Sequence, residues 1–388
     1  MGFQTDCTTT GEDRQSYEGS VSPPIYASSL FVAPTLEEFE AALMDQGGSR
    51  YVYTRLRNPT VEVLEQKLAL LERAEACKFF ASGMAAIAAV VMDACQAGQH
   101  VIAGWAGYNH AYKLLAQYLP SYGIETTFVD TTSVEAIEAA IRPTTRLLYL
   151  ESPANPTMQI VDIAACVELA RGHGLATAVD NSLPTPYNQR PSEYGTDYTI
   201  HSATKYLGGH SDAVAGAVTG SHERIGALSA RQHADLGGII GPFEGWLILR
   251  GMRTLGIRMQ VHNRSAATIA GWLEHHPKVK RVHYPGLESH PQVALAKRQM
   301  SGGSGLVGVV VHGGFEAART LADTLKLFGI GVSWGGFESL ALPMWRISSM
   351  PVEMRRDIGL EESFVRLSMG LEDVEDLQTD LEDALATI

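Results

Sequence analysis

The chain has 388 residues, of which 45% are hydrophobic and 19% charged, so it is long enough for two packed domains and too balanced for disorder. Its formal net charge of −13 argues against a nucleic-acid-binding surface, because such surfaces neutralise phosphates with clustered Lys and Arg. Its apolar runs, such as residues 84–92, are far shorter than the roughly 20 residues of a membrane span. We expect a globular protein with neither nucleic-acid nor membrane partners.

The cysteines and the first residues indicate a cytoplasmic protein. Cys7, Cys77, Cys95 and Cys166 have no CxxC spacing, and a chain of this size needs no disulfides to hold a core. The start, MGFQTDCTTTGED, lacks the basic-then-apolar order of a secretory signal. Neither an HExxH motif nor a His/Cys cluster has metal-ligand spacing, so we expect reduced thiols and no metal site.

The pattern of apolar residues divides the chain into three parts. Residues 1–50 mix turn-forming residues with a short acidic piece and are predicted to form an N-terminal arm. Residues 51–241 alternate short apolar runs with helix-like segments, such as 61–73 and 162–173, in which apolar residues recur every three or four positions. This alternation predicts an α/β fold with a mainly parallel sheet sandwiched by helices. Residues 242–388 are predicted to form a smaller C-terminal α+β domain.

Six apolar runs in the second part are predicted strands. In such sheets a ligand binds beyond the carboxyl ends of the strands, so we expect the polar residues that follow the runs to cluster. The runs are CKFF from Cys77, HVIAG from His100, TTFVD from Thr126, RLLYLE from Arg146, LATAVD from Leu175 and TDYTIHS from Thr196. The polar residues that follow them are Ser82, Gly83, Glu151, Asn155, Asp180, Ser202, Thr204 and Lys205.

Lys205 and Asp180 have the residue types that hold pyridoxal phosphate (PLP) by its two working ends. A lysine amine can form a Schiff base with the PLP aldehyde, while a buried carboxylate keeps the pyridine nitrogen protonated. Taken singly, Lys205 could be a solvated surface lysine and Asp180 an Asx turn or a helix cap. The apolar sequence before Lys205 and the GGHSD after it favour a dry pocket, in which the pKa of a lysine falls.

The segment FFASGMAAIAAVV around Ser82 has the order strand, Ser-Gly turn and Ala-rich helix, which can receive a phosphate. Gly83 would let the backbone approach the anion closely, and the helix dipole favours negative charge there. A simple helix cap is the more common outcome for Ser-Gly alone. The hydroxyls of Ser202 and Thr204, just before Lys205, support the phosphate interpretation.

Eight motifs occur in order along nearly the whole chain: YTRLRNPT, ASGMAAI, ESPANPT, VDNS, HSATKYLGGHSD, YPGLESHPQ, SWGGFESL and RLSMGLED. Together they resemble the Cys/Met-metabolism family of PLP-dependent enzymes. That family includes cystathionine β-lyase, cystathionine γ-lyase, methionine γ-lyase and cystathionine γ-synthase. The resemblance implies PLP fold-type I architecture and usually a homotetramer, a dimer of dimers with shared active sites.

The resemblance implies a role for each matching residue. Lys205 would be the Schiff-base lysine and would carry the proton at Cα, Asp180 would pair with the pyridine nitrogen, and Asn155 would lie near the ring hydroxyl. Tyr108 would stack on the ring and assist as an acid or base, although Asn109 and His110 replace the small residues that commonly follow it in the family. Phosphate contacts would come from Gly83, Met84, Ser202 and Thr204, and from Tyr53 and Arg55 of a neighbouring subunit. Ser333 and Arg366 would bind the substrate α-carboxylate, for which a guanidinium is a two-pronged donor.

The sequence leaves the leaving group open. SWGG with Trp334 and the acidic LEDVEDLQTDLEDAL resemble bacterial cystathionine β-lyases, whereas YTRLRNPT and ASGMAAI are closer to γ-lyases. Val332 stands where cystathionine γ-lyase typically has a glutamate. We expect a PLP-dependent lyase that removes a sulfur or other heteroatom group from the β or γ carbon of an L-amino acid, with a cystathionine β-lyase-like activity as the first choice.

Several alternatives stay open. One is a γ-lyase acting on cystathionine, methionine or canavanine, and another is a γ-replacement synthase resembling cystathionine γ-synthase. A catalytically silent PLP-binding protein is disfavoured by the retained Lys205, Tyr108 and Arg366. Arg57 and Arg346 depart from the family pattern and either face the distal end of the substrate or are solvated surface arginines.

Overall fold

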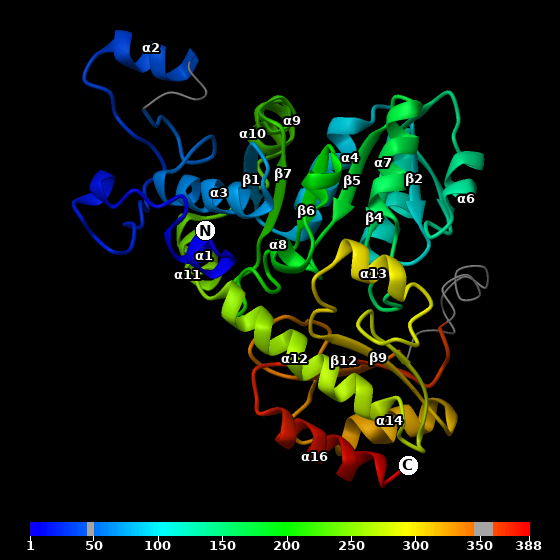
Figure 1. The fold of residues 1–388 in the computed structure, drawn as a ribbon. Helices are drawn as coiled ribbons and strands as arrows, with labels where there is room; N and C mark the ends of the chain where they lie inside the picture. The colour runs from blue at the N-terminus through cyan, green and yellow to red at the C-terminus, as the bar shows by residue number, and fades with distance from the viewer. Residues whose placement is uncertain (45–49, 345–359) are drawn as a thin grey trace.

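The computed structural model describes residues 1–44, 50–344 and 360–388, and two sheets dominate the fold (Figure 1). The larger sheet has the strand order β1-β7-β6-β5-β4-β2-β3, and its neighbours from β3 to β6 are parallel. Strand β7 runs antiparallel to both β1 and β6. The strands are β1 (Ala76–Phe80), β2 (His100–Gly104), β3 (Glu125–Val129), β4 (Thr145–Glu151), β5 (Ala176–Asp180), β6 (Tyr198–His201) and β7 (Gly216–Gly220). The predicted mainly parallel sheet is confirmed, and all six predicted runs overlap strands β1 to β6.

Helices cover both faces of this sheet because successive side chains of a strand point to opposite sides. In β4, Leu147 and Tyr149 share a core with α4 (Gly83–Ala94), whereas Leu148 and Leu150 share another with α7 (Ile163–Gly172). The other helices of this part are α3 (Pro59–Glu72), α5 (Asn109–Lys113), α6 (Val134–Ala139), α8 (Thr185–Asn188), α9 (His222–Leu228), α10 (Ala234–Leu236) and α11 (Pro242–Met252).

The smaller sheet follows the long helix α12 (Leu255–Leu273) and has the order β10-β11-β12-β9-β8. Helices α12, α14 and α16 pack on it around one apolar core, below the larger sheet in Figure 1. Its elements are β8 (Val279–His283), α13 (Val293–Gln299), β9 (Leu306–Val311), α14 (Gly314–Thr324), β10 (Gly329–Ile330), β11 (Leu340–Pro343), β12 (Phe364–Ser368) and α16 (Val374–Leu385). The two sheets fall in residues 51–241 and 242–388, and the division of the chain at those bounds stays a prediction.

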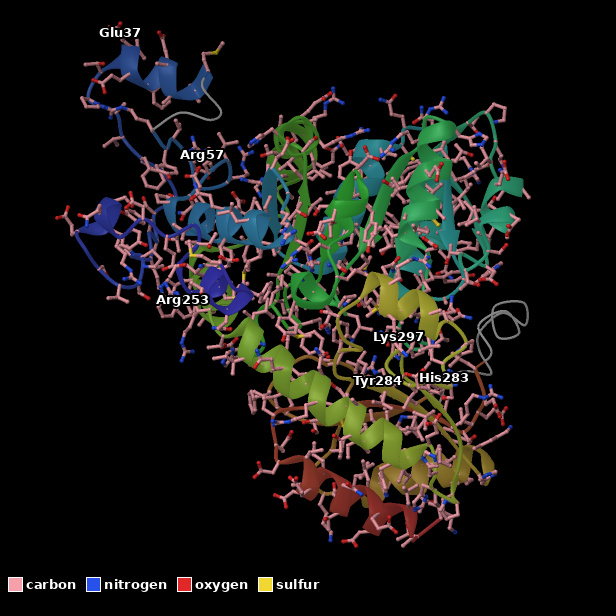
Figure 2. The ribbon with its side chains drawn as sticks, in the orientation of Figure 1. Glu37, Arg57, Arg253, His283, Tyr284 and Lys297 are labelled. Carbon is pink, nitrogen blue, oxygen red and sulfur yellow. The ribbon has the colours of Figure 1, made fainter. Side chains whose placement is uncertain are left out.

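The N-terminal residues have two different environments. Helix α1 (Phe3–Thr9) lies against the body of the protein, where the buried Lys67 ammonium donates to the carbonyls of Cys7 and Thr10 at 2.9 and 2.7 Å. Glu12 pairs with Arg253, which Figure 2 shows beside α1. Helix α2 (Leu36–Met44) has no buried residue and projects away from the sheets (Figure 1). Among the described N-terminal residues, α2 therefore projects and α1 packs on the body, and the predicted arm of residues 1–50 stays a prediction.

Within the described ranges, no helix has the length and apolar character needed to cross a membrane. The same residues contain no group of three or more His, Cys, Asp or Glu side chains that could hold a metal ion. The four cysteines are buried, and none is bonded to another.

Candidate active site

Asp180 and Glu151 stand side by side at the carboxyl ends of β5 and β4, where they face each other in the strand register. The Asp180 carboxylate is buried and accepts a hydrogen bond from the Ser182 amide at 3.0 Å. Burial raises the pKa of Asp180, and the hydrogen bonds from Ser182 and the charge of His201 oppose that rise. A protonated ring nitrogen beside this carboxylate would stabilise its ionised form, so Asp180 fits the pyridine end of PLP.

Lys205 follows β6 on a tight turn and points its amine toward the smaller sheet. Its Nζ donates to Ser333 Oγ at 2.7 Å and lies 5.4 Å from the centre of the Trp334 ring. Burial, together with the positive charge of Arg366, lowers the pKa of Lys205 to about 8. Gly335 packs on the backbone of this turn with φ +83, and a Cβ there would lie 2.9 Å from the Tyr206 amide nitrogen. The lysine is therefore held firmly and is readily deprotonated, as a nucleophilic or proton-carrying amine must be.

The N-terminus of α4 has the features of a phosphate site. Ser82 caps the helix by accepting from the Ala85 amide at 3.1 Å. Within the described part of the chain, the amides of Gly83 and Met84 donate to no protein acceptor, so both can face an anion. A Cβ at Gly83 would lie 3.0 Å from the Cβ and Oγ of Ser202, which places the Ser202 hydroxyl at the same helix end.

Thr204 lies two positions after Ser202, but its hydroxyl already forms hydrogen bonds within the protein. It donates to the Ala215 carbonyl at 3.1 Å and accepts from the Ala215 amide at 3.0 Å. In this arrangement Thr204 fixes the segment that follows Lys205, and a donated bond to phosphate would require the first of these bonds to break.

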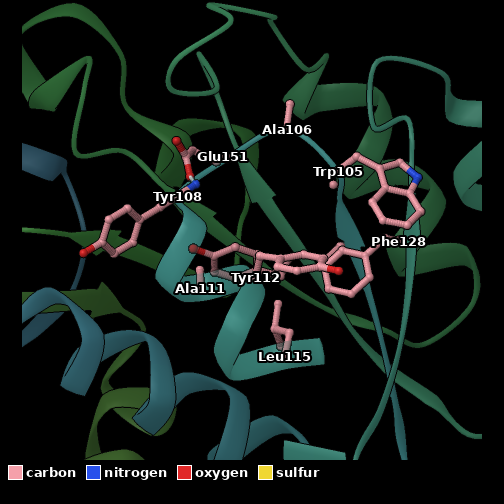
Figure 3. A pocket seen from close by; sticks show the side chains of 12 residues that line it. Trp105, Ala106, Tyr108, Ala111, Tyr112, Leu115, Phe128 and Glu151 are labelled. Carbon is pink, nitrogen blue, oxygen red and sulfur yellow. Dashed lines mark hydrogen bonds between the residues drawn. The ribbon is translucent and has the colours of Figure 1, made fainter. Parts of the chain in front are cut away.

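Tyr108 and Asn155 are both held by Glu151. The Tyr108 amide donates to Glu151 Oε2 at 2.7 Å (Figure 3). The Asn155 amide donates to Glu151 Oε1 at 2.8 Å. Burial raises the pKa of the Tyr108 phenol, and the carboxylates of Asp180 and Glu151 add to the rise. The Tyr108 ring lies 5.5 Å from the ring of His110. These contacts bring Tyr108 and Asn155 to the same sheet edge as Asp180.

Arg366, in β12, supplies a buried cation at the smaller sheet. Its guanidinium donates to the carbonyls of Val332 and Ser333 at 2.8 and 3.0 Å and to Asn155 Oδ1 at 3.4 Å. Burial lowers the pKa of Arg366 to about 10, and no carboxylate forms an ion pair with it among the residues described. A buried guanidinium needs an anion for compensation, so a substrate carboxylate fits at this position.

Tyr53 and Arg55 lie on the segment before α3, and within the described part of the chain neither forms a hydrogen bond, ion pair or ring contact with Lys205 or Asp180. Arg55 bonds the Ala234 carbonyl, and its guanidinium lies 5.6 Å from the centre of the Tyr53 ring. Their action on a neighbouring subunit stays a prediction. Arg57 lies nearby (Figure 2), pairs with Glu62 at 2.8 Å and stacks over the Tyr51 ring. Its predicted alternative, Arg346, lies outside the described residues.

Sequence reasoning gave no role to two carboxylates that organise the site. Glu151 was noted only as a strand-end residue, although its place next to Asp180 in the parallel register was a usable signal. Glu72, at the end of α3, was missed altogether. Its Oε1 accepts from Asn181 Nδ2 at 2.9 Å and lies 2.6 Å from His201 Nε2, so it holds the neighbours of Asp180 and Ser202.

The strand ends and the start of α4 thus bring together a lysine, a buried aspartate and an anion site. Within a mainly parallel sheet covered by helices, these features define a PLP-dependent enzyme of fold-type I. Lys205, Asp180 and the start of α4 would hold the cofactor. The cofactor supplies an electron-withdrawing ring that acidifies the Cα proton of a bound amino acid.

Comparison with known proteins gives the same result. Residues 4–386 match the family model described as "Cys/Met metabolism PLP-dependent enzyme", and the chain belongs to that family. It is 41% identical to the L-methionine gamma-lyase of Treponema denticola, over 99% of this chain and 97% of that protein. It is 40% identical to the cystathionine gamma-lyase of Bacillus subtilis, over 98% and 97% of the two chains.

A solved structure supports the fold directly. The crystal structure of metB from Corynebacterium glutamicum superposes with a TM-score of 0.93 at 36% identity and covers 100% of this chain and 98% of that one. The resemblance, fold-type I architecture, PLP dependence and carbon–sulfur lyase class that the sequence predicted are confirmed. The preference for a cystathionine β-lyase-like activity receives no specific support, because the relatives compared above and a probable synthase are named as γ-lyases or a γ-synthase.

Proposed function

We propose that this protein is a γ-lyase that acts on a sulfur-containing L-amino acid, with methionine as the preferred substrate. The observation that carries the proposal is the pair Val332 and Arg366. The Val332 carbonyl accepts from Arg366 Nη2 at 2.8 Å, so Val332 adjoins the proposed carboxylate site through its backbone, and its apolar side chain is 80% exposed. This apolar neighbour suits the methylthio end of methionine better than the charged distal end of cystathionine.

The proposed reaction converts L-methionine and water into methanethiol, ammonia and 2-oxobutanoate. The Cγ–S bond breaks and sulfur leaves with its electron pair, after protons have been removed from Cα and Cβ. Arg366 and Ser333 would bind the α-carboxylate and so orient Cα toward Lys205. The Lys205 amine, with its lowered pKa, would accept the Cα proton, and Tyr108 would protonate the departing sulfur.

A γ-replacement synthase is the second candidate. It is supported by 42% identity to the probable cystathionine gamma-synthase of Herpetosiphon aurantiacus, over 84% of this chain and 99% of that protein. The same residues serve both reactions up to loss of the γ substituent. A synthase then adds a thiol at Cγ, whereas a lyase protonates Cγ and releases a product whose Cα–N bond is hydrolysed to give 2-oxobutanoate and ammonia. The geometry of the described residues gives no reason to prefer replacement.

Product analysis of the purified holoenzyme separates these activities. The protein is incubated separately with L-methionine, with L-cystathionine, and with an acylated homoserine plus cysteine. We expect methanethiol and 2-oxobutanoate from methionine, at the highest kcat/KM of the three. Pyruvate and homocysteine from cystathionine would instead establish β-elimination, and cystathionine from the third mixture would establish the synthase.

The same proposal includes a cytoplasmic homotetramer in which Tyr53 and Arg55 reach the phosphate of a neighbouring subunit. Tyr53 is 42% exposed in the single chain, so its ring is accessible to a neighbouring subunit. Light scattering coupled to gel filtration tests the mass. Mixing a Lys205→Ala variant with an Arg55→Ala variant tests sharing, because hybrid oligomers would regain intact sites only if residues cross between subunits.

A further inference from the structure

Glu151 uses both of its carboxylate oxygens to hold backbone amides of two separate loops. Oε2 accepts from Tyr108, which precedes α5, and Oε1 accepts from Asn155, which follows β4. The two residues that contact Glu151 lie 43 positions before it and 4 after it. Both distances, 2.7 and 2.8 Å, lie at the short end of the range for N–H···O hydrogen bonds.

The loop that carries Tyr108 is shaped to bring its backbone onto this carboxylate. Gly107 has φ +150, and a Cβ there would lie 2.9 Å from Glu151 Oε2, so a larger residue would push the loop away. The other side of the loop packs on aromatic rings, with Trp105 and Tyr112 lying 5.2 and 4.8 Å from the Phe128 ring (Figure 3). The loop is therefore held by a hydrogen bond to Glu151 and by apolar packing of these aromatic rings.

The contacts of Glu151 continue into the substrate site. Asn155, held through its amide, accepts from Arg366 Nη1 through its side chain. A continuous path therefore runs from Tyr108 through Glu151 and Asn155 to Arg366. It joins the proposed ring-stacking residue of the larger sheet to the proposed carboxylate ligand of the smaller sheet.

The position of Glu151 beside Asp180 carries an electrostatic cost. Burial raises the pKa of Glu151 and the neighbouring Asp180 carboxylate adds to the rise, while the two amide bonds oppose it. Two buried carboxylates at adjacent strand ends repel each other. Because this repulsion disfavours the folded state, we look for a role that offsets it at each carboxylate. Asp180 would pair with the ring nitrogen, and Glu151 has no such partner among the described residues.

We propose that Glu151 is a positioning residue that keeps the Tyr108 loop and the Asn155–Arg366 pair in register around the cofactor and substrate. It acts through these residues and does not touch the reacting atoms. The proposal rests on the proposed roles of Tyr108, Asn155 and Arg366 and holds for any leaving group.

Hydrogen–deuterium exchange of the cofactor-free protein tests the positioning directly, apart from any activity. In Glu151→Ala both amides lose their acceptor, so exchange in peptides covering residues 105–112 and 152–158 should accelerate about tenfold or more. In Glu151→Gln one oxygen remains as an acceptor, and only one of the two segments should accelerate. Wild-type exchange in both segments of Glu151→Ala would overturn the proposal, and the near-isosteric Gln variant keeps the test decisive if Glu151→Ala fails to fold.

A matched control changes another carboxylate that accepts hydrogen bonds from two backbone amides. Asp380 accepts from the amides of Lys326 and Leu327 at 2.9 and 2.8 Å in the smaller domain, away from Tyr108. Asp380→Asn should leave exchange of both site segments and kcat/KM unchanged. Reconstituted Glu151→Gln should retain cofactor but show a higher KM and a weaker circular-dichroism band of the bound ring. Equal effects in Asp380→Asn would show general loosening and refute a positioning role for Glu151.

Discussion

Lys205 Nζ and Ser333 Oγ are hydrogen-bonded at 2.7 Å although 128 positions separate them in the chain. Lys205 follows β6 of the larger sheet, and Ser333 lies between β10 and β11 of the smaller one. The bond therefore links the larger-sheet and smaller-sheet parts of the protein at the amine that would bind the cofactor. Arg366 also donates to the Ser333 carbonyl, so Lys205 and the proposed carboxylate ligand both bond the same residue of the loop between β10 and β11.

Capture of PLP by the cofactor-free protein should follow the protonation state of Lys205. Burial and the charge of Arg366 lower its pKa to about 8, so the amine is charged below that pH and neutral above it. Because only the neutral amine attacks an aldehyde, the capture rate should rise with pH up to about 8 and then level off. Stopped-flow absorbance measures the rate, with Lys205→Arg as the control that cannot capture PLP. A rate that keeps rising toward pH 10 would contradict the lowered pKa.

Gly83→Ala should weaken PLP binding by about tenfold, equivalent to about 1.4 kcal/mol. The added methyl would lie 3.0 Å from Ser202 Cβ and Oγ, which forces the start of α4 away from the hydroxyl that shares the proposed phosphate site. Equilibrium titration of the cofactor-free variant with PLP measures the loss.

Gly226→Ala is the matched control for this change. Gly226 lies within α9, and a Cβ there would meet no atom within 4 Å. Its PLP affinity should equal that of the wild type, and its free energy of unfolding should rise by about 0.5–1 kcal/mol from the loss of a helical glycine. Unchanged affinity in Gly83→Ala as well would remove the start of α4 from the phosphate site.

The sequence predicted those parts of the fold and site that depend on local patterns. Runs of buried apolar residues identified β1 to β6, and the convergence of parallel strand ends brought Asp180 and Lys205 to one edge. Strand β7 was missed because the glycines at its two ends leave an apolar run of only two residues, Ala217 and Val218, before Thr219. Glu72 was missed because its partners, Asn181 and His201, lie 109 and 129 positions away and only tertiary packing brings them to α3.

Val332→Glu should shift substrate preference from methionine toward cystathionine. The Val332 side chain is 80% exposed, so a longer residue fits without disturbing the core. A carboxylate there would attract the distal ammonium group of cystathionine, and the ratio of kcat/KM for cystathionine to that for methionine should rise about tenfold. Val332→Gln has the same length without the charge and should leave the ratio near the wild-type value. An equal rise in both variants would assign the effect to size.

Glu72→Ala should destabilise the fold and weaken cofactor binding together. Its Oε1 accepts from the Asn181 amide group and from His201 Nε2, and all three side chains are buried. Removing the carboxylate leaves two buried donors without an acceptor, at a cost of about 3 kcal/mol in the free energy of unfolding. Asn181 directly follows Asp180, and His201 directly precedes Ser202. The variant should therefore position both the ring-nitrogen partner and the phosphate-site hydroxyl less precisely, which weakens PLP binding.

Urea unfolding and PLP titration of the same variants separate this role from a general effect of removing a carboxylate. Glu193→Ala removes an exposed carboxylate that pairs with Arg73 at the end of the same helix, α3, and should cost at most about 1 kcal/mol without changing PLP affinity. Glu72→Gln keeps an acceptor oxygen and should fall between the two variants. A Glu72→Ala protein as stable as Glu193→Ala would mean that water or a rearranged side chain satisfies Asn181 and His201. Stability loss without weaker PLP binding would show that Glu72 supports the core but not the cofactor site.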